Sequence, residues 1–271
     1  MAGGLLKNLY KPVSNLRKGA NGQVTIIGGS SLFHGAPILA LKTASRIVDM
    51  VFFSSPEKSV GEVAEKLKSQ LASFIWVPFN ELDKYIEKSD AVLIGPGFMR
   101  YEKEGGSGVD SSGRISREIT EKFLKKYPKK KWVIDAGSLQ VIEPVWIPDD
   151  SIITPNEKEY KMLFGNLSVG EAAKKYNCII ISKGEKGLVC SAEKCMQVKN
   201  GNPGFTKGGT GDVMAGLAVA LLAKNEPFLA ACATALFGKS AADELKKKFG
   251  DFYNADDLAD QIPKTLHKLT K

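Results

Sequence analysis

Short apolar runs rich in valine and isoleucine recur along the chain and predict a sheet. Several of these runs are apolar throughout, without alternating polar residues, which is the pattern of strands covered on both faces. The runs occupy residues 24–29, 50–55, 74–78, 91–95, 132–137, 151–155 and 178–182.

Helical patterns fill most of the gaps between these runs. Residues 36–49 and 60–71 repeat apolar side chains at helical spacing, and residues 116–127 begin with Ser116, a good helix cap. Alternation of strand and helix favours right-handed βαβ units. We therefore expect an α/β fold with a mostly parallel central sheet and helices on both of its faces.

Three segments depart from this alternation. Residues 187–199 contain two strand-like runs around a short polar turn, which predicts a hairpin at the edge of the sheet. Residues 211–270 are mainly helical in pattern. Residues 102–113 predict a surface loop, either a plain one or one that lies near a ligand.

Composition narrows the class of protein. The 271 residues are 43% hydrophobic, enough for one large core, and length alone allows one or two domains. The net charge of +8 could favour anionic ligands. However, the lysines are spread along the chain, and we interpret the one tight run, KKYPKKK at 125–131, as the solvated end of a helix. We expect no nucleic-acid partner.

Cysteine usage and apolar run lengths bear on the cellular compartment. None of Cys178, Cys190, Cys195 and Cys232 forms a CxxC pair, so we expect buried free thiols and a reducing compartment. The first residues are too short and polar for a secretory signal, and no charge-free apolar stretch is long enough to span a membrane. We expect a soluble, cytoplasmic protein without a membrane partner.

A glycine-rich turn, NPGFTKGGTGDVMAG at 202–216, is the first candidate site. Gly208, Gly209 and Gly211 precede Asp212 and an apolar helix. Glycines let backbone amides approach an anion, and the start of a helix supplies free amides and a favourable dipole. The turn therefore predicts a phosphate site, in which Asp212 is either a reacting group or an N-terminal helix cap.

A second candidate follows a predicted strand, in TPNEKEY at 154–160. Asn156 and Glu159 stand one helical turn apart if a helix begins there. Glu159 would then be able to hold the water shell of Mg²⁺. The alternative is a capping box in which the two residues satisfy each other's amides.

Together these motifs resemble the ribokinase-like superfamily, and most closely its ADP- or ATP-dependent NAD(P)H-hydrate dehydratases. The resemblance covers nearly the whole chain and implies a three-layer α/β/α domain over residues 1–271, without the N-terminal epimerase domain of larger members. Two positions depart from the family pattern: Gly137 replaces a frequent second acid, and Asn156 replaces a histidine of many bacterial members. The segments that carry it are GGSSLFHGAPILA (28–40), VLIGPGF (92–98), VIDAGSL (133–139), ITPNEKEYKMLFG (153–165), ISKGEKGLV (181–189) and the glycine turn.

The resemblance implies nucleotide-dependent dehydration of (6S)-NAD(P)H hydrate. In this metabolite repair reaction ADP or ATP phosphorylates the hydroxyl of the hydrate, and phosphate then leaves. Asp212 would be the base, and the amides of Gly209, Thr210 and Gly211 would form the anion hole. Asn156 tilts the expected donor slightly towards ATP.

The resemblance also implies the binding residues. Ala36 and Gly97, with Asn156 and Asp212, would contact the hydrate, and Glu159 would support Mg²⁺ through water. Asp135 is as consistent with structural support as with ligand contact, and His34 is interpreted as an exposed loop histidine. We expect a homo-oligomer. Residues that would contact ADP or ATP are Lys183, Gly184, Glu185, Lys186, Gly187, Lys207, Gly208 and Gly211.

Two other functions fit parts of the same pattern. A kinase for hydroxymethyl-pyrimidine, thiazole or pyridoxal would use the same base and anion hole but release a phosphorylated product. A nucleotide-binding regulator without turnover would not need Asp212, because binding phosphate requires no base. The pair of early glycine turns at 28–37 and 95–98 favours the dehydratase over the kinase.

Overall fold

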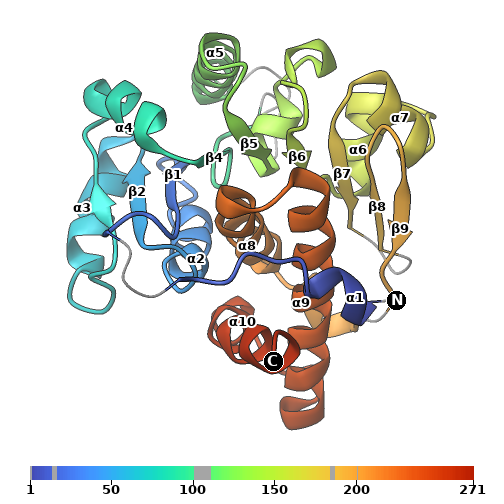
Figure 1. The fold of residues 1–271 in the computed structure, drawn as a ribbon. Coiled ribbons are helices and arrows are strands. Elements are labelled where there is room, and N and C mark those ends of the chain that lie inside the picture. The colour runs from blue at the N-terminus through green and yellow to red at the C-terminus, as the bar shows by residue number, and fades with distance from the viewer. Residues whose placement is uncertain (1, 14–16, 101–110, 184–186, 200) are drawn as a thin grey trace.

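A computed structural model describes residues 2–13, 17–100, 111–183, 187–199 and 201–271. Its centre is a nine-stranded sheet in the order β3-β2-β1-β4-β5-β6-β7-β8-β9 (Figure 1). Neighbours from β3 to β7 are parallel, and β8 and β9 add an antiparallel edge. The strands are β1 Gln23–Ile27, β2 Met50–Ser54, β3 Ile75–Trp76, β4 Ala91–Ile94, β5 Lys131–Ile134, β6 Ile152–Ile153, β7 Ile179–Ser182, β8 Leu188–Cys190 and β9 Cys195–Gln197.

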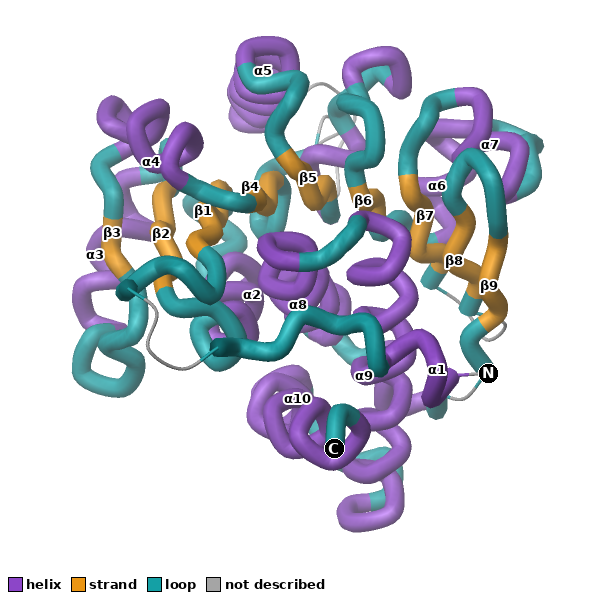
Figure 2. Tube along the Cα trace, in the orientation of Figure 1, coloured by secondary structure: helices purple, strands orange, loops and turns teal. Residues whose placement is uncertain are grey.

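Helices cover both faces of this sheet, as Figures 1 and 2 show. The helices α1, α2, α3, α8, α9 and α10 pack on one face, and α4, α5, α6 and α7 pack on the other. Their bounds are α1 Ala2–Leu6, α2 Gly35–Ala44, α3 Lys58–Leu67, α4 Leu82–Lys88, α5 Ser111–Lys126, α6 Glu157–Phe164, α7 Val169–Lys175, α8 Thr210–Lys224, α9 Pro227–Phe249 and α10 Ala255–Leu269.

Alternate strand residues feed two apolar clusters. In β5, Val133 packs on the side of α8 and α9, whereas Trp132 and Ile134 pack on the side of α5. In β7, Ile179 and Ile181 take the first side and Ile180 the second. This use of both strand faces explains the continuous apolar runs. The expected three-layer α/β/α fold is confirmed.

The parallel register brings the carboxyl ends of the central strands to one edge. Ile27 of β1 lies opposite Ile94 of β4, which pairs in turn with Ile134 of β5, and Ile134 pairs with Ile153 of β6. Each strand is followed at once by a turn. Parallel sheets bind their ligands beyond these ends, so the turns after β1, β4, β5, β6 and β7 define the region of the candidate site.

Helix α8 packs unusually close to α2. At Gly216 an added Cβ would collide with the backbone of Ala40, so only glycine allows this approach. The close contact fixes the N-terminal end of α8 relative to the helix that follows β1.

The hairpin and the helical C-terminal region are confirmed, but the start of α5 differs from expectation. The helix begins at Ser111, so Ser116 lies inside it as a buried residue and not at its cap. Lys125 and Lys126 occupy its last turn, as expected for a solvated helix end. Of the predicted surface loop at 102–113, residues 102–110 lie outside the described part of the chain, and residues 111–113 belong to α5.

The expectation of four free thiols is wrong for one pair. Cys190 and Cys195 lie opposite each other in the hairpin and form a disulfide. Four residues separate the two cysteines, so they do not form a CxxC motif. The pairing of β8 with β9 brings their sulfurs together. Cys178 and Cys232 are free and buried, and burial raises the pKa of each thiol to about 12. Among the described residues, no helix has the length and apolar character needed to cross a membrane.

Candidate functional site

The turns after β1 and β4 interlock. The amide of Gly29 donates to the carbonyl of Pro96 at 2.8 Å. Gly97 is buried with a φ of 75°, and a Cβ there would come within 2.5 Å of the Phe33 carbonyl oxygen. Only glycine satisfies both conditions. Because Phe33 and Pro37 flank Ala36 in sequence and both approach Gly97, the structure brings the two predicted hydrate-binding positions together.

The turn after β5 explains why Gly137 has no side chain. A Cβ at Gly137 would collide with the carbonyl of Phe98 in the turn after β4. A second acid cannot fit there without moving that turn. The preceding Ala136 adopts a φ of 50°, a left-handed conformation that is unfavourable for alanine. Such strained residues cluster at functional sites.

A buried ion pair occupies the middle of the strand ends. Asp135 directly follows β5 and is 1% exposed, and its Oδ1 accepts a hydrogen bond from the Lys183 ammonium at 2.8 Å. The Thr154 hydroxyl donates to the same carboxylate. Burial alone would lower the pKa of Lys183, but Asp135, with Glu159 and Asp212, raises it above its ordinary value. Lys183 is therefore charged.

Asp212 lies in the first turn of α8, close enough to Lys183 for the two charges to interact. Burial raises the pKa of Asp212 to about 7, the negative charge of Asp135 adds to the rise, and Lys183 opposes it. Glu159 also contributes to the rise. A carboxylate with a pKa near neutrality can accept a proton under ordinary conditions, which is the property required of a general base.

The glycine turn differs from the expected anion hole at one residue. Gly209 is the N-cap of α8 with a φ of 88°, so Asp212 is not the cap. The Thr210 amide donates to the Lys207 carbonyl at 3.2 Å and is not free for an anion. Within the described residues, the amides of Gly209 and Gly211 have no such acceptor. An added Cβ at Gly211 would lie 3.2 Å from the Lys183 nitrogen, so this turn faces the ammonium.

Asn156 and Glu159 form the capping box that was weighed against a metal site. The Asn156 side chain accepts from the Glu159 amide, and Glu159 Oε2 accepts from the Asn156 amide, both at 2.9 Å. Glu159 Oε1 accepts from Gln140 at 3.0 Å. Glu159 is 4% exposed, whereas Asn156 is exposed. The cap positions Glu159 close enough to influence Asp212.

The predicted nucleotide-binding residues do not all gather. Residues 184–186, which include Gly184, Glu185 and Lys186, lie outside the described part, and Gly208 is exposed. Gly187 is buried against Lys239, whose ammonium donates to the Val198 carbonyl at 2.8 Å. Lys207 is exposed, and its ammonium binds the carbonyls of Asp251 and Tyr253 at 2.6 and 2.7 Å. Lys183 pairs with Asp135 and faces Gly211 of the glycine turn.

Sequence reasoning missed two features of this region. It left Asp135 undecided because its partner, Lys183, is 48 residues away along the chain. It did not single out Lys239, which resembles any lysine of a surface helix until the fold buries it to 7% exposure. The available signal for Lys239 was its position on an apolar face of the helix, one turn after Ala235 and one turn before Ala242.

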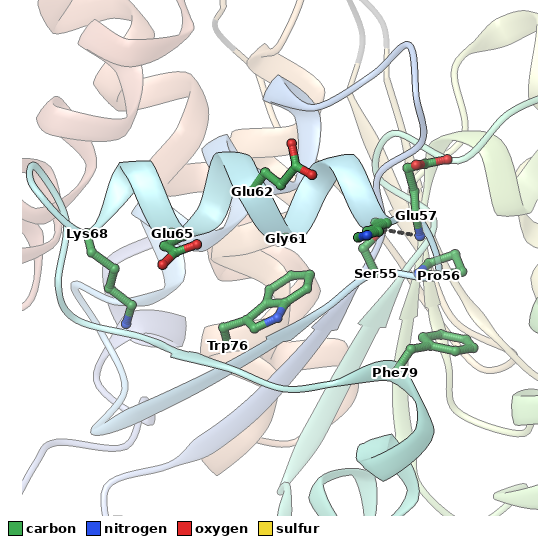
Figure 3. Close-up of a pocket in the computed structure, with 10 residues that line it drawn as sticks. Ser55, Pro56, Glu57, Gly61, Glu62, Glu65, Lys68, Trp76 and Phe79 are labelled. Atoms are coloured by element: carbon green, nitrogen blue, oxygen red, sulfur yellow. Dashed lines mark hydrogen bonds between the residues drawn. The ribbon is translucent and has the colours of Figure 1, made fainter.

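A separate hollow of about 670 Å³ lies along α3, away from the charged centre. Figure 3 shows Trp76 and Phe79 on one side and Glu57, Glu62 and Glu65 along the helix. His34 Nε2 lies 3.1 Å from the Ser59 hydroxyl, which bonds Glu57. His34 is therefore half-buried and in contact with Ser59, and not an exposed loop residue.

Comparison with known proteins gives one consistent family. The sequence profile of the NAD(P)H-hydrate dehydratase family matches residues 24–264. The bifunctional NAD(P)H-hydrate repair enzyme Nnr of Methanocaldococcus jannaschii is 38% identical over 97% of this chain, which spans 52% of that relative's length. The ADP-dependent (S)-NAD(P)H-hydrate dehydratase of Nitrosopumilus maritimus is 28% identical, over 95% of this chain and 93% of the relative.

The fold has solved counterparts. The ADP/ATP-dependent NAD(P)H-hydrate dehydratase of Bacillus subtilis, co-crystallised with ATP and Mg²⁺ and soaked with CoA, superposes with a TM-score of 0.80. The identity is 18%, and the match covers 98% of this chain and 97% of the other. At this identity the likeness concerns the fold alone.

Proposed function

The chain belongs to the NAD(P)H-hydrate dehydratase family, and on that premise we propose that it restores (6S)-NAD(P)H hydrate to NAD(P)H by nucleotide-dependent dehydration. The observation that carries the proposal is Asp212. Its carboxylate has a pKa near 7 and lies beside a charged lysine and a glycine turn. A helix cap needs none of these properties.

The geometry supports a two-stage reaction. Asp212 accepts the proton of the hydrate hydroxyl as its oxygen attacks the terminal phosphorus of the nucleotide, whose bond to the departing nucleotide breaks, so that ADP leaves as AMP or ATP leaves as ADP. The amides of Gly209 and Gly211 and the ammonium of Lys183 stabilise the charge of the transferring group. The carbon–oxygen bond of the phosphorylated hydrate then breaks, the neighbouring carbon loses a proton, and the ring double bond reforms with release of phosphate.

The charges of the site fit a magnesium ion. Asp135, Glu159 and Asp212 surround one ammonium, so the centre carries excess negative charge before any anionic nucleotide arrives. Among the described residues no three metal-ligating side chains form a closed metal cage. Mg²⁺ needs no such cage, because it usually keeps several of its waters and binds between phosphates and one or two carboxylates. Glu159 would hold it through water, and the ion would neutralise phosphate charge.

The proposed substrates occupy opposite sides of this centre. The hydrate would lie against Ala36 and Gly97, with Asn156 near its reacting end, and the nucleotide would lie along Lys183, Gly187 and the glycine turn. The donor is ADP or ATP. The relative from Nitrosopumilus maritimus is named ADP-dependent, which favours ADP over the slight preference for ATP drawn from Asn156.

The test is the recovery of NADH absorbance from purified hydrate with Mg²⁺ and either ADP or ATP. We expect wild-type protein to restore absorbance and release phosphate in equal amounts. Asp212→Asn preserves size and polarity but cannot accept the proton, so turnover should fall about 10²–10⁴-fold. Nucleotide binding should survive, because a negative charge near the phosphates is removed.

Two outcomes would contradict the proposal. Near-normal turnover by Asp212→Asn would leave the glycine turn as a binding element only. Accumulation of a phosphorylated product without recovery of absorbance would indicate a kinase of the same superfamily.

A further inference from the structure

We propose that Asp135 is a positioning residue for phosphoryl transfer, which holds the Lys183 ammonium between the glycine turn and Asp212. This inference rests on the proposed function. It assigns a task to a buried carboxylate that touches neither proposed substrate.

The environment of the Asp135 carboxylate indicates a role that needs its charge. Asp135 is 1% exposed at the end of β5, and its described side-chain partners are Lys183 and the Thr154 hydroxyl. Burying an ionised carboxylate is expensive, and a buried ion pair is seldom better for stability than apolar packing. A pair retained at the carboxyl edge of a parallel sheet therefore points to a function that needs the charge.

Asp135 also sets the direction of the Lys183 side chain. Lys183 follows β7, and its side chain crosses β6 to reach Asp135, which follows β5. In this position its nitrogen faces Gly211, where an added Cβ would stand only 3.2 Å away. Without Asp135, a flexible four-carbon side chain that is 30% exposed could turn to solvent. The buried carboxylate selects the one orientation that faces the proposed phosphoryl site.

Asp135 also influences the protonation of Asp212, the proposed base. The charged groups that act on Asp212 come from three elements: Asp135 after β5, Glu159 on α6 and Lys183 after β7. Asp135 and Glu159 favour its protonated form, and Lys183 favours the ionised form. By holding Lys183 in place, Asp135 balances its own charge with an opposite one near Asp212.

The experiment compares wild type, Asp135→Asn, Lys183→Met and the double variant in the dehydratase assay. Asparagine still accepts the two hydrogen bonds but lacks the charge. We expect kcat to fall roughly 10- to 100-fold in Asp135→Asn, the loss typical of a hydrogen bond to a charged group. If Asp135 acts through Lys183, the double variant should be no slower than Lys183→Met alone.

The pH dependence tests whether Asp135 holds Lys183. In wild type the acid limb of kcat/KM should have its midpoint near 7, where Asp212 ionises in the free enzyme. In Asp135→Asn the midpoint should change little, because the released Lys183 ammonium withdraws its positive charge as the negative charge of Asp135 is lost, whereas Lys183→Met alone should raise it. If Lys183 stays in place without Asp135, the midpoint of Asp135→Asn should instead fall clearly below 7. Carboxylate ¹³C NMR of Asp212 in ligand-free protein reports the same midpoint without any turnover.

Asp83→Asn is the matched control, since Asp83 also pairs with a lysine, Lys126, at 2.8 Å but on the surface. It should leave kcat and the profile unchanged. Additive losses in the double variant, or a midpoint of Asp135→Asn that falls clearly below that of wild type in both measurements, would overturn the inference. A wild type without dehydratase activity would instead refute the proposed function, and the NMR midpoint would still decide the contact. Should Asp135→Asn not fold, an unchanged kcat in Lys183→Met would also overturn it.

Discussion

Asp212 carries a conflict between folding and chemistry. Its pKa of about 7 in the folded protein lies well above the ordinary value of 3.8, so the folded state holds a proton that the unfolded chain releases. Between these values the folded state binds more protons, and the free energy of unfolding therefore falls as pH rises. Above pH 7 the full cost of the buried charge is present.

This conflict predicts that a variant with lower activity is more stable. At pH 8 the free energy of unfolding of Asp212→Asn should exceed that of wild type by an amount on the order of 2–4 kcal/mol. The variant should therefore also unfold at a higher temperature. The difference should shrink through pH 6 and vanish near pH 3, below the ordinary value of 3.8, where the wild-type carboxyl is protonated in both states. Thermal melts at the three pH values measure it.

Asp83→Asn is the control, because the pKa of Asp83 is shifted in the opposite direction to that of Asp212. The hydrogen bond from Lys126 is the first cause that holds the pKa of Asp83 below its ordinary value. Asp83→Asn should therefore bring no gain at pH 8. A stabilised Asp83→Asn, or an Asp212→Asn that gains equally at every pH, would contradict the assignment of the effect to the buried charge.

At the residue scale, sequence reasoning located Asp212 because glycines and a helix start leave a local pattern. It could not locate the contacts of Asp135, Lys183 and Lys207, because each partner comes from a distant element. For Lys207 the local pattern was misleading. A lysine before glycines suggests phosphate, whereas the fold offers it two carbonyls first.

At the element scale, α6 shows one sequence feature with two tasks. The capping box of Asn156 and Glu159 satisfies two amides at the start of the helix. It also fixes the Glu159 carboxylate near the charged centre. The cap and the proposed contact with the hydrate place different demands on Asn156, because any small polar oxygen can cap a helix, whereas the amide group is needed for a specific contact.

Two substitutions separate these demands. Asn156→Ser keeps a capping oxygen, so the melting temperature should stay close to wild type, while KM for the hydrate should rise if the amide contacts it. Asn156→Ala removes the cap and should destabilise the protein by about 1 kcal/mol as well. Thermal melts and steady-state kinetics together test this. Equal KM values for Asn156→Ser and wild type would leave Asn156 as a cap alone.

Strands could be predicted from the sequence most clearly where both of their faces are buried. The apolar runs located the strands β1 to β7, and all of these except the partly exposed edge strand β3 are largely buried on both faces. The start of α5 was not readable. Residues 111–115 have a weak helical pattern, and Ile119 and Phe123, which anchor the helix in the core, lie further along. The disulfide also depended on strand pairing.

At the scale of the whole molecule, the resemblance of several weak motifs in a fixed order identified the fold and family, which no single motif could. The proposed site draws on five strand ends and on α8, so a ligand that fills it connects much of the chain. Binding to the folded state alone stabilises it by mass action.

We therefore expect ADP or ATP with Mg²⁺ to raise the melting temperature. At about 100 times its dissociation constant a nucleotide should add roughly 2.7 kcal/mol, or about 5–10 °C for a chain of this size. Adenosine, which lacks the phosphates, should have little effect. An unmoved melting temperature with both nucleotides at saturation would show that the nucleotide site is misassigned.

The contacts of Lys207 have a consequence for the synthesis of the protein. The turn that precedes α8 rests on residues made later: Lys207 binds the carbonyls of Asp251 and Tyr253, Gly204 packs on the Tyr253 ring, and Gly209 faces Ala255. A nascent chain on the ribosome folds its earlier elements first. The sheet can thus assemble while the glycine turn still lacks its support, and the proposed phosphate site is complete only once residues 251–255 have emerged.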